Sequence, residues 1–302
     1  MLFDGAMGTM LIARGLSLGR PPERWNLDQP SSVREIHLAY LSAGAEVIGT
    51  NTFGGSPGRL SSFGLGRDTG KINTAGVLLA MDALSEIART APADAASPGE
   101  SAAVRPPARR RFVAFSMGPT GKMLSPVGNA SPEEIADEFS AQILDTRAAY
   151  DMILFETMFD LREALIAVAS ARKHASVPVA ATLTFMKNPR GFFTIMGDDP
   201  ALSMRKLQAA GAGIVGANCT IASAEMLELA RALRESTDLP LLCQPNAGQP
   251  RVVDGRPVYD QTPADFAADA VALFAAGVNA VGGCCGTTPR FIQEVATRMT
   301  QQ

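Results

Sequence analysis

Residues 278–289 read VNAVGGCCGTTP, a short apolar run that ends in a turn of glycines and cysteines. Similar apolar, β-branched runs recur along the chain, and each is followed by an amphipathic stretch typical of a helix. We predict eight strands: Met1–Asp4, Glu46–Thr52, Phe112–Met117, Met152–Glu156, Val177–Thr184, Gly213–Asn218, Leu239–Gln244 and Val278–Gly283.

The intervening stretches carry helix start signals. Ser131–Glu134 places a capping serine before a proline at the first helical position and a glutamate three residues later. Ile135, Phe139 and Ile143 then recur on one face. Thr262–Asp265 opens another helix in the same way.

Alternating strands and helices predict a parallel sheet with right-handed crossovers. Eight repeats in 302 residues fit a single-domain (β/α)₈ TIM barrel, whose usual size is roughly 250 residues. A doubly wound open sheet is the alternative. It has less support, because Gly5 and Gly8 in DGAMGT do not match the G-x-G-x-x-G pattern of a dinucleotide-binding turn.

The bulk composition is that of an ordinary soluble protein, with 46% hydrophobic residues and a net charge of -3. Slight acidity gives no electrostatic reason to expect nucleic acid or an anionic membrane as a partner. The first ten residues, MLFDGAMGTM, lack the basic start of a signal peptide. No apolar run reaches the roughly 20 residues of a membrane span. We therefore expect a cytoplasmic enzyme.

One stretch departs from the strand–helix rhythm. Residues 90–111, TAPADAASPGESAAVRPPARRR, are rich in alanine and proline and end in three arginines. Loops of this length are either functional or loosely ordered. Since the stretch precedes the third predicted strand, we expect a flexible insertion at the end of the barrel away from the chemistry; a basic docking arm is the alternative.

The four cysteines are Cys219, Cys243, Cys284 and Cys285. A disulfide between the adjacent pair is unfavourable, because neighbouring Cα atoms lie about 3.8 Å apart and disulfides prefer roughly 4.4–6.8 Å. A disulfide framework is also unusual in a chain of this size without export signals. The pair is therefore predicted to be two free thiols or two metal ligands.

Polar and glycine-rich residues follow most of the predicted strands, at the end of the barrel where catalytic groups gather. Cys219 follows the sixth strand, and Cys284 and Cys285 follow the eighth, so the three thiols are expected to converge. Gly282 and Gly283 let the backbone turn so that both adjacent thiols face one point.

Three convergent thiolates are predicted to hold Zn²⁺ and to leave the fourth position open, as in catalytic zinc sites. The alternative is that the cysteines pack as small apolar residues, which is our interpretation of Cys243. His37 and His174 lie in helical stretches among polar neighbours and are not assigned to the metal.

A zinc ion with three thiolates is a weak Lewis acid, poorly suited to ionising water. A sulfur ligand suits its open position better. A coordinating thiol loses its proton, whereas a free thiol is only a few per cent thiolate at pH 7. The site therefore favours attack of a substrate thiolate on an electrophilic carbon, that is, alkyl transfer to sulfur.

The other end of a thiol substrate also needs partners. Asp4 and Glu156 are expected to stand near each other and to bind an ammonium group, while the N–H groups of Gly5 and Ala6 receive a carboxylate. The alternatives are a helix cap or loop salt bridge for Asp4 and a buried ion pair for Glu156. Paired carboxylates also occur in glycosidases, but that function would leave the cysteines without a role.

DGAMGTM, GTNTFG, GPTG, FET, GANC, PNAG and GGCCGTTP occur in this order over nearly the whole chain. They resemble the zinc-dependent homocysteine S-methyltransferases, most closely the homocysteine-binding module of cobalamin-dependent methionine synthase. The resemblance implies a (β/α)₈ barrel, zinc on Cys219, Cys284 and Cys285, homocysteine as substrate and a role in methionine biosynthesis.

The resemblance also assigns residues around the substrate. It implies that the amino acid portion of homocysteine lies against Asp4, Gly5, Ala6 and Glu156. Asn51 and Asn218 match polar positions of the family's pocket. The side-chain oxygen of Asn246 is expected to occupy the fourth zinc position when no substrate is bound.

The chain departs from the family in having a short first strand, the insertion at residues 90–111 and no D-x-H-x-x-G cobalamin signature. We therefore expect the methyl donor to be methylcobalamin on a separate corrinoid domain or protein. S-methylmethionine or a betaine is the alternative donor. Two other classes stay open: a zinc or redox module without turnover, and a subunit that only delivers homocysteine.

Overall fold

The computed structural model describes residues 1–90, 110–253 and 256–301. Residues 91–109 of the predicted insertion lie outside this range. Seven parallel strands form one curved sheet in the order β1-β2-β3-β4-β7-β8-β11. Their bounds are β1 Val47–Gly49, β2 Phe112–Met117, β3 Met152–Met158, β4 Val179–Leu183, β7 Ile214–Ala222, β8 Leu241–Asn246 and β11 Ala280–Val281.

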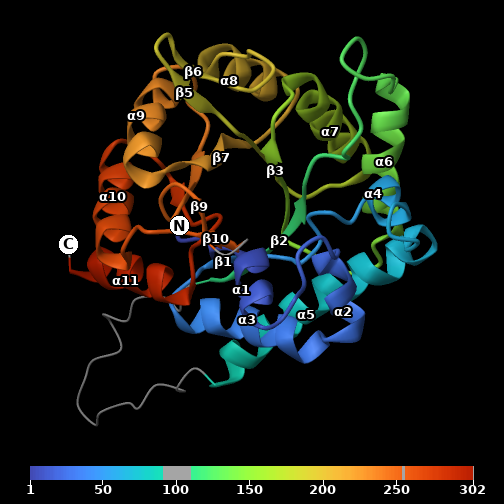
Figure 1. The fold of residues 1–302 in the computed structure, drawn as a ribbon, viewed down its shortest axis with the longest axis horizontal. Coiled ribbons are helices and arrows are strands. Elements are labelled where there is room, and N and C mark those ends of the chain that lie inside the picture. Colours follow the sequence, from blue (N-terminus) through green and yellow to red (C-terminus); the bar gives the residue numbers. More distant parts are fainter. Residues whose placement is uncertain (91–109, 254–255, 302) are drawn as a thin grey trace.

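The first predicted strand closes this sheet into a ring, although it is shorter than expected. Leu2 bridges Val281 of β11, and Phe3 bridges Val47 of β1, both in parallel. The Phe3 N–H donates to the Val281 carbonyl at 2.8 Å, and the Asp4 N–H donates to the Val47 carbonyl at 2.9 Å. Met1–Asp4 is thus a pair of isolated bridges in the eighth position, and the (β/α)₈ barrel is confirmed (Figure 1).

Helices surround the barrel (Figure 1). They are α1 Met7–Ala13, α2 Trp25–Asp28, α3 Pro30–Ser42, α4 Pro57–Ser61, α5 Thr69–Thr90, α6 Pro132–Asp145, α7 Leu161–His174, α8 Pro200–Ala209, α9 Ser223–Arg234, α10 Pro263–Ala275 and α11 Pro289–Thr300, with 3₁₀ turns at Pro22–Arg24 and Gly66–Asp68.

The predicted caps are confirmed: Ser131 forms a full capping box on α6, and the Thr262 side chain accepts from the Asp265 N–H at α10. Within the described ranges, no helix has both the length and the apolar character needed to cross a bilayer.

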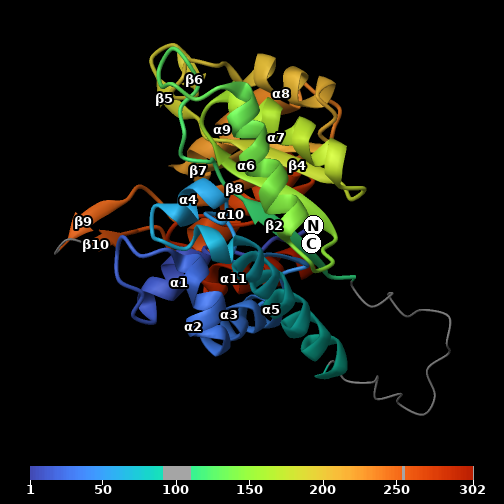
Figure 2. The same cartoon turned by 90° about the vertical axis from the view of Figure 1, so that its right-hand side faces the viewer.

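Two antiparallel hairpins interrupt the strand–helix alternation. β5 (Met186–Asn188) pairs with β6 (Gly191–Phe193) after β4, and β9 (Arg251–Val253) pairs with β10 (Arg256–Val258) after β8. Figure 2 shows the second hairpin projecting from the end of the barrel at which the α1 and α4 segments also lie. The carboxyl ends of the strands therefore carry the added structure.

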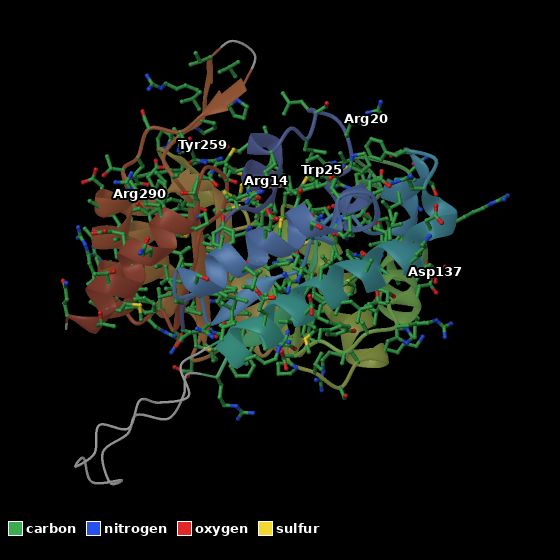
Figure 3. All side chains as sticks on the ribbon, turned by 90° about the horizontal axis from the view of Figure 1, so that it is seen from below. Arg14, Arg20, Trp25, Asp137, Tyr259 and Arg290 are labelled. Atoms are coloured by element: carbon green, nitrogen blue, oxygen red, sulfur yellow. The ribbon has the colours of Figure 1, made fainter. Side chains whose placement is uncertain are left out.

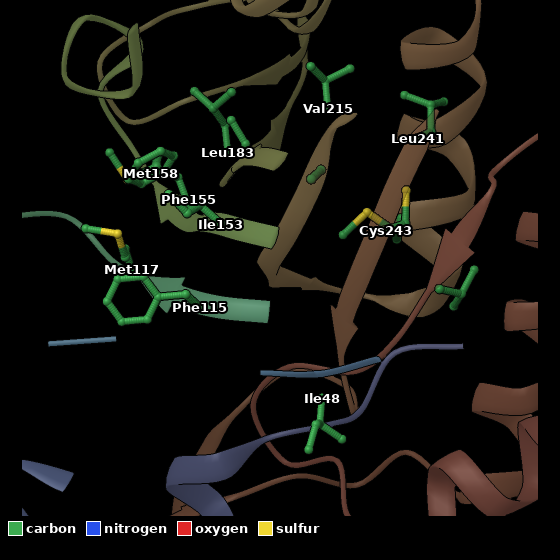
Figure 4. Packing of buried hydrophobic residues seen from close by; sticks show 14 of the residues in the cluster. Ile48, Phe115, Met117, Ile153, Phe155, Met158, Leu183, Val215, Leu241 and Cys243 are labelled. Atoms are coloured by element: carbon green, nitrogen blue, oxygen red, sulfur yellow. The ribbon is translucent and has the colours of Figure 1, made fainter. Parts of the chain in front are cut away.

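The strands alternate between two buried faces, as the two-residue period of a strand requires. One face packs on the helices: Phe155 of β3 meets Phe139 of α6 edge-on, with ring centroids 5.4 Å apart. Figure 4 shows side chains of this layer. The other face fills the barrel with a second cluster, namely Phe3, Val47, Ala114, Met152, Leu154, Ala180, Leu242 and Ala280.

Two residues further along each strand, the inward positions become small or polar. These positions are Gly49, Ser116, Glu156, Thr182, Asn218, Gln244 and Gly282. The interior is therefore apolar in its lower layers and polar at the carboxyl ends of the strands, which is where the functional side chains lie.

We expect Gly216→Ala to destabilise the barrel by about 1–3 kcal/mol. A Cβ atom at Gly216 of β7 would overlap the backbone of Leu242 on the neighbouring strand, lying 2.8 Å from its carbonyl carbon. Gly213→Ala is the matched control, because its Cβ would meet only the Val179 oxygen at 3.8 Å. Urea midpoints measure both; equal midpoints for the two variants would contradict the packing described here.

Candidate metal centre and substrate pocket

A cavity of about 560 Å³ opens at the carboxyl ends of the strands. Eight of the ten residues predicted for the site line it: Asp4, Gly5, Ala6, Asn51, Glu156, Cys219, Cys284 and Cys285. Asn218 and Asn246 are not among its lining residues. The structure thus gathers residues from both ends of the chain at one site.

The three predicted ligand sulfurs converge. The Sγ atoms of Cys219, Cys284 and Cys285 all lie within 4.8 Å of one another, and those of Cys219 and Cys285 are 3.9 Å apart. A tetrahedral zinc with Zn–S bonds of about 2.3 Å separates its sulfurs by about 3.8 Å. The spacing and the chemistry of these donors fit a metal ion.

Unusual backbone conformations aim the thiol of β7. Cys219 and Thr220 have φ angles of 60° and 65°, in the left-handed region that non-glycine residues rarely adopt. The pairing of β7 with β8 is interrupted by a bulge between Asn218 and Ala222. Bulges redirect side chains next to active sites, and here the bulge turns Cys219 towards the other two thiols.

Hydrogen bonds to neighbouring strands hold the loop that carries the other two thiols. The Cys284 N–H donates to the Pro245 carbonyl at 2.8 Å, and the Ala247 N–H donates to the Cys285 carbonyl at 3.0 Å. The Gly283 N–H donates to the Asp4 carbonyl at 2.9 Å. The loop is therefore fastened both to β8 and to the first segment of the chain.

Asn218 orients the thiols from outside the cavity lining. Its Oδ1 accepts from the Thr157 N–H and from the Thr182 hydroxyl, each at 2.7 Å. Its Nδ2 donates to the Thr157 hydroxyl at 2.8 Å and contacts the Cys284 sulfur at 3.9 Å. The amide thus ties β3, β4 and β7 to one ligand, and such outer partners fix the direction of metal-binding side chains.

The pKa values of the clustered thiols are shifted in different directions. The pKa of Cys285 is lowered to about 3, because Cys219 and then Cys284 donate hydrogen bonds to its sulfur. The pKa of Cys284 is raised well above its usual value, first by its own hydrogen bond with Cys219 and then by the one with Cys285. Cys243 is separate: it is fully buried on β8, and burial raises its pKa to about 12, as expected of a core residue. A negatively charged Cys285 sulfur, with two further sulfurs beside it, favours the binding of a cation.

Two amide oxygens near the thiols have no hydrogen-bond partner in the described part of the chain. Asn246 Oδ1 and Gln244 Oε1 are both buried at the end of β8. Buried polar atoms are rarely left unpaired, so each points to an additional ligand or water. The Asn246 oxygen is consistent with the expected fourth metal ligand.

Two carboxyl groups face each other across the cavity. Asp4 Oδ2 accepts from the Gly49 N–H at 2.9 Å, and Glu156 accepts a hydrogen bond from the Ser116 hydroxyl. Burial raises the pKa of Asp4 well above its usual value, and the charge of Glu156 raises it further. Burial also raises the pKa of Glu156.

Neither Asp4 nor Glu156 forms an ion pair with a basic side chain among the described residues. The helix cap, salt bridge and buried ion pair that were the alternatives are thus not observed in that range. Two mutually repelling carboxyl groups in one cavity, of which Asp4 is buried and Glu156 is partly buried, suit a cationic ligand because they have no counter-ion in the described residues.

Of the other predicted substrate residues, Ala6 and Asn51 already form hydrogen bonds with other parts of the protein. The Ala6 N–H donates to the Thr287 hydroxyl at 3.1 Å, whereas the Gly5 N–H has no acceptor in the described ranges. Both side-chain N–H groups of Asn51 donate, to the Pro22 carbonyl and to Asn26 Oδ1 at 2.9 Å each. Asn51 therefore holds the wall of the cavity with its amide nitrogen.

His37 lies in a helix, α3, as expected. It is completely buried, and neither ring nitrogen has a partner in the described residues. Burial lowers its pKa to about 4, so it is a neutral core residue. Neither His37 nor His174 belongs to the thiol cluster.

Several site residues were not assigned from the sequence. Ser116 and Gln244 line the cavity, and Phe53 and Arg59 form its outer part, with the guanidinium 5.7 Å from the ring centroid. Ser116 and Gln244 lie near the carboxyl ends of β2 and β8, and that position is the signal that could have identified them. Tyr259 interacts with the Cys285 thiol, and burial raises its pKa. In Figure 3 it lies at the hairpin end of the barrel.

The fold and the site define a class of protein, namely a (β/α)₈ barrel with three convergent thiols that could hold a metal ion and two carboxyls in the same cavity. The sequence profile of one family, homocysteine S-methyltransferase, matches residues 1–299. The chain belongs to the homocysteine S-methyltransferase family.

Two curated relatives are methionine synthases. The chain is 31% identical over 98% of its length to that of Mycobacterium tuberculosis and 29% identical over 100% to that of Mycobacterium leprae. It spans 24% of each relative's length. The metallated form of the Escherichia coli homocysteine methyltransferase MmuM matches with a TM-score of 0.79 and 23% identity, over 99% of this chain and 96% of that chain. This likeness supports the barrel fold.

Proposed function

We propose that this chain transfers a methyl group to the thiol of homocysteine, giving methionine, with Zn²⁺ held by Cys219, Cys284 and Cys285. The observation that carries the proposal is the meeting of three sulfurs, within 4.8 Å of one another, and two unpaired carboxyls in one cavity. A thiol amino acid has one functional group for each of these two features: its sulfur binds the metal, and its ammonium binds the two carboxyls.

Zinc would supply thiolate chemistry at neutral pH, because a thiol coordinated to the ion is deprotonated yet stays nucleophilic. The chain's own residues bind and orient. Asp4 and Glu156 take the ammonium of homocysteine, and the Gly5 N–H receives its carboxylate. Asn246 Oδ1, which has no described partner, supplies the fourth ligand when homocysteine is absent.

The surface around the cavity favours a protein-borne donor, methylcobalamin on a corrinoid domain or protein. Eleven large apolar side chains are exposed in the described residues, and eight of them lie on the loops that follow the strands at the mouth. These eight are Leu18, Phe63, Val127, Met186, Ile195, Val252, Val253 and Val258. Exposed apolar residues that gather on one face are typical of a protein-docking surface.

S-methylmethionine or a betaine is the second candidate donor. The cavity extends past the thiols to Phe53, Arg59 and Phe63, which gives a small donor a place within it. Free thiols in both proposals need a reducing environment, so we also infer a cytoplasmic location.

Methionine formation from homocysteine, measured with each donor in turn, tests the proposal. We expect activity with methylcobalamin, and more when it is presented on a corrinoid protein. Activity with S-methylmethionine alone would select the second donor, and no methionine from any donor would reject both. Zinc-edge X-ray absorption tests the site separately: added homocysteine should change a three-sulfur site into a four-sulfur site.

A further inference from the structure

Thr287 lies where the cysteine loop meets the first segment of the chain, and it is completely buried. Its hydroxyl donates to the Cys284 carbonyl at 2.6 Å and accepts from the Ala6 N–H at 3.1 Å. Its own N–H also donates to the Cys284 carbonyl at 3.1 Å. One hydroxyl therefore bonds the backbone of a metal-ligand residue and that of a pocket residue 281 positions away.

Two glycines make room for this side chain. A Cβ atom on Gly5 would lie 2.6 Å from the Thr287 hydroxyl, and one on Gly283 would lie 2.7 Å from the Thr287 Cβ. Contacts this short require a shift of the backbone or the side chain. The threonine thus fills the space between the substrate segment and the metal loop, and movement of either one displaces it.

The buried side chain of Tyr40 contacts both segments at the same junction. The Tyr40 hydroxyl contacts the carbonyls of Ala6 and Thr287, at 3.1 and 3.2 Å. The Gly286 N–H donates to the Thr9 hydroxyl at 3.1 Å, which adds a second link between the two segments. Hydrogen bonds therefore connect the two segments at several points, and contiguous hydrogen-bond networks of this kind carry energetic coupling between sites.

We propose that Thr287 is a positioning residue that couples the metal ligands to the amino acid pocket. The Thr287 hydroxyl bonds both the Cys284 carbonyl and the Ala6 N–H. If zinc were bound to Cys284 and Cys285, it would restrain the loop further, and this hydroxyl would pass the restraint on to the neighbouring Gly5 N–H and Asp4 carboxyl, which receive the substrate's amino acid end. The proposal rests on the proposed function for the identity of the metal and the substrate class.

Coupling of this kind is reciprocal and can be measured without catalysis. L-2-aminobutyrate has the amino acid end of homocysteine but no sulfur, so it cannot bind the metal as a thiolate. A direct effect of the zinc charge on this ligand is the same in the wild type and in a Thr287 variant, so the part of the zinc effect that the variant loses passes through Thr287.

The test is calorimetric binding of L-2-aminobutyrate to the zinc-free and the zinc-loaded protein. We expect zinc to tighten binding by about fivefold or more in the wild type, the low end of ordinary coupling. Thr287→Val keeps the shape but removes the hydroxyl, and it should lower this ratio toward one. Thr287→Ser keeps the hydroxyl and should retain the ratio.

Three results would overturn the inference. A wild-type affinity ratio of one, or an unchanged ratio in Thr287→Val, would show that Thr287 does not couple the two sites. If zinc and L-2-aminobutyrate still bind in these experiments, the proposed function is not contradicted. Failure of the wild type to bind zinc or the amino acid rejects both. If Thr287→Val does not fold, Tyr40→Phe, which loses both hydroxyl contacts, replaces it: a reduced ratio supports the coupling and an unchanged ratio contradicts it.

Discussion

Cys284→Ala is expected to abolish stoichiometric zinc binding and to lower methionine formation by more than about a hundredfold. Loss of an outer hydrogen-bond partner alone costs up to about a hundredfold in affinity or activity, and loss of a direct ligand removes one of three sulfurs. Cys284 is also the thiol that Asn218 contacts, so the variant leaves that amide without its sulfur neighbour. Metal analysis after dialysis, together with methionine assays, measures both effects.

Cys243→Ala is the matched control, because it also removes one buried thiol, from the strand beside the cluster. It should keep its zinc and its activity while losing a little stability to the small cavity that it creates. Unchanged zinc content in Cys284→Ala, or equal zinc loss in both variants, would rule out the proposed ligand set.

Asp4→Asn is expected to weaken homocysteine binding by about 10–100-fold while it stabilises the metal-free protein. The binding loss reflects one charge-assisted hydrogen bond to the ammonium, worth about 1.5–3 kcal/mol. The asparagine oxygen can still accept from the Gly49 N–H, which isolates the effect of charge.

The stability effect has a definite sign. Burial raises the pKa of Asp4 in the folded protein. The carboxyl therefore stabilises the fold fully only below its unfolded pKa, about 3.9, and this contribution is lost as the pH rises through the folded value. Asparagine does not ionise, so the free energy of unfolding of the variant should exceed that of the wild type at neutral pH.

Calorimetric homocysteine binding and urea unfolding between about pH 4 and pH 8 measure the two effects. Asp137→Asn is the control: this carboxylate lies exposed on α6 at the outer side of the barrel (Figure 3), it does not line the cavity, and its removal should change neither quantity. Wild-type homocysteine affinity in Asp4→Asn would reject the ammonium site, and a lower stability would contradict the raised pKa.

Much of the fold follows from local patterns in the sequence. Short apolar runs followed by capped amphipathic stretches predicted the strands and helices, and the capping signals at Ser131 and Thr262 are confirmed. Strand ends were less predictable. β7 extends through a bulge to Ala222, and Met1–Asp4 forms only two bridges, because pairing with neighbours decides where a strand ends.

The candidate site was predictable to the extent that barrel topology brings strand ends together. That rule sufficed for Cys219, Cys284 and Cys285, whose sulfurs lie within 4.8 Å of one another. It could not reveal that the Ala6 N–H is already bonded to Thr287. Nor could it show that His37 is buried, since polar neighbours in sequence point to different sides of a helix.

The amino acid sequence by itself determined the period of each element, the order of strands and helices and the chemistry of the thiols, because these depend on residue type and on neighbours along the chain. Only the tertiary structure decided which of these groups touch. The Thr287 hydroxyl meets Ala6 because closure of the ring brings the first and last segments of the barrel side by side. Contacts between such distant positions arise from packing in three dimensions, and local sequence patterns do not predict them.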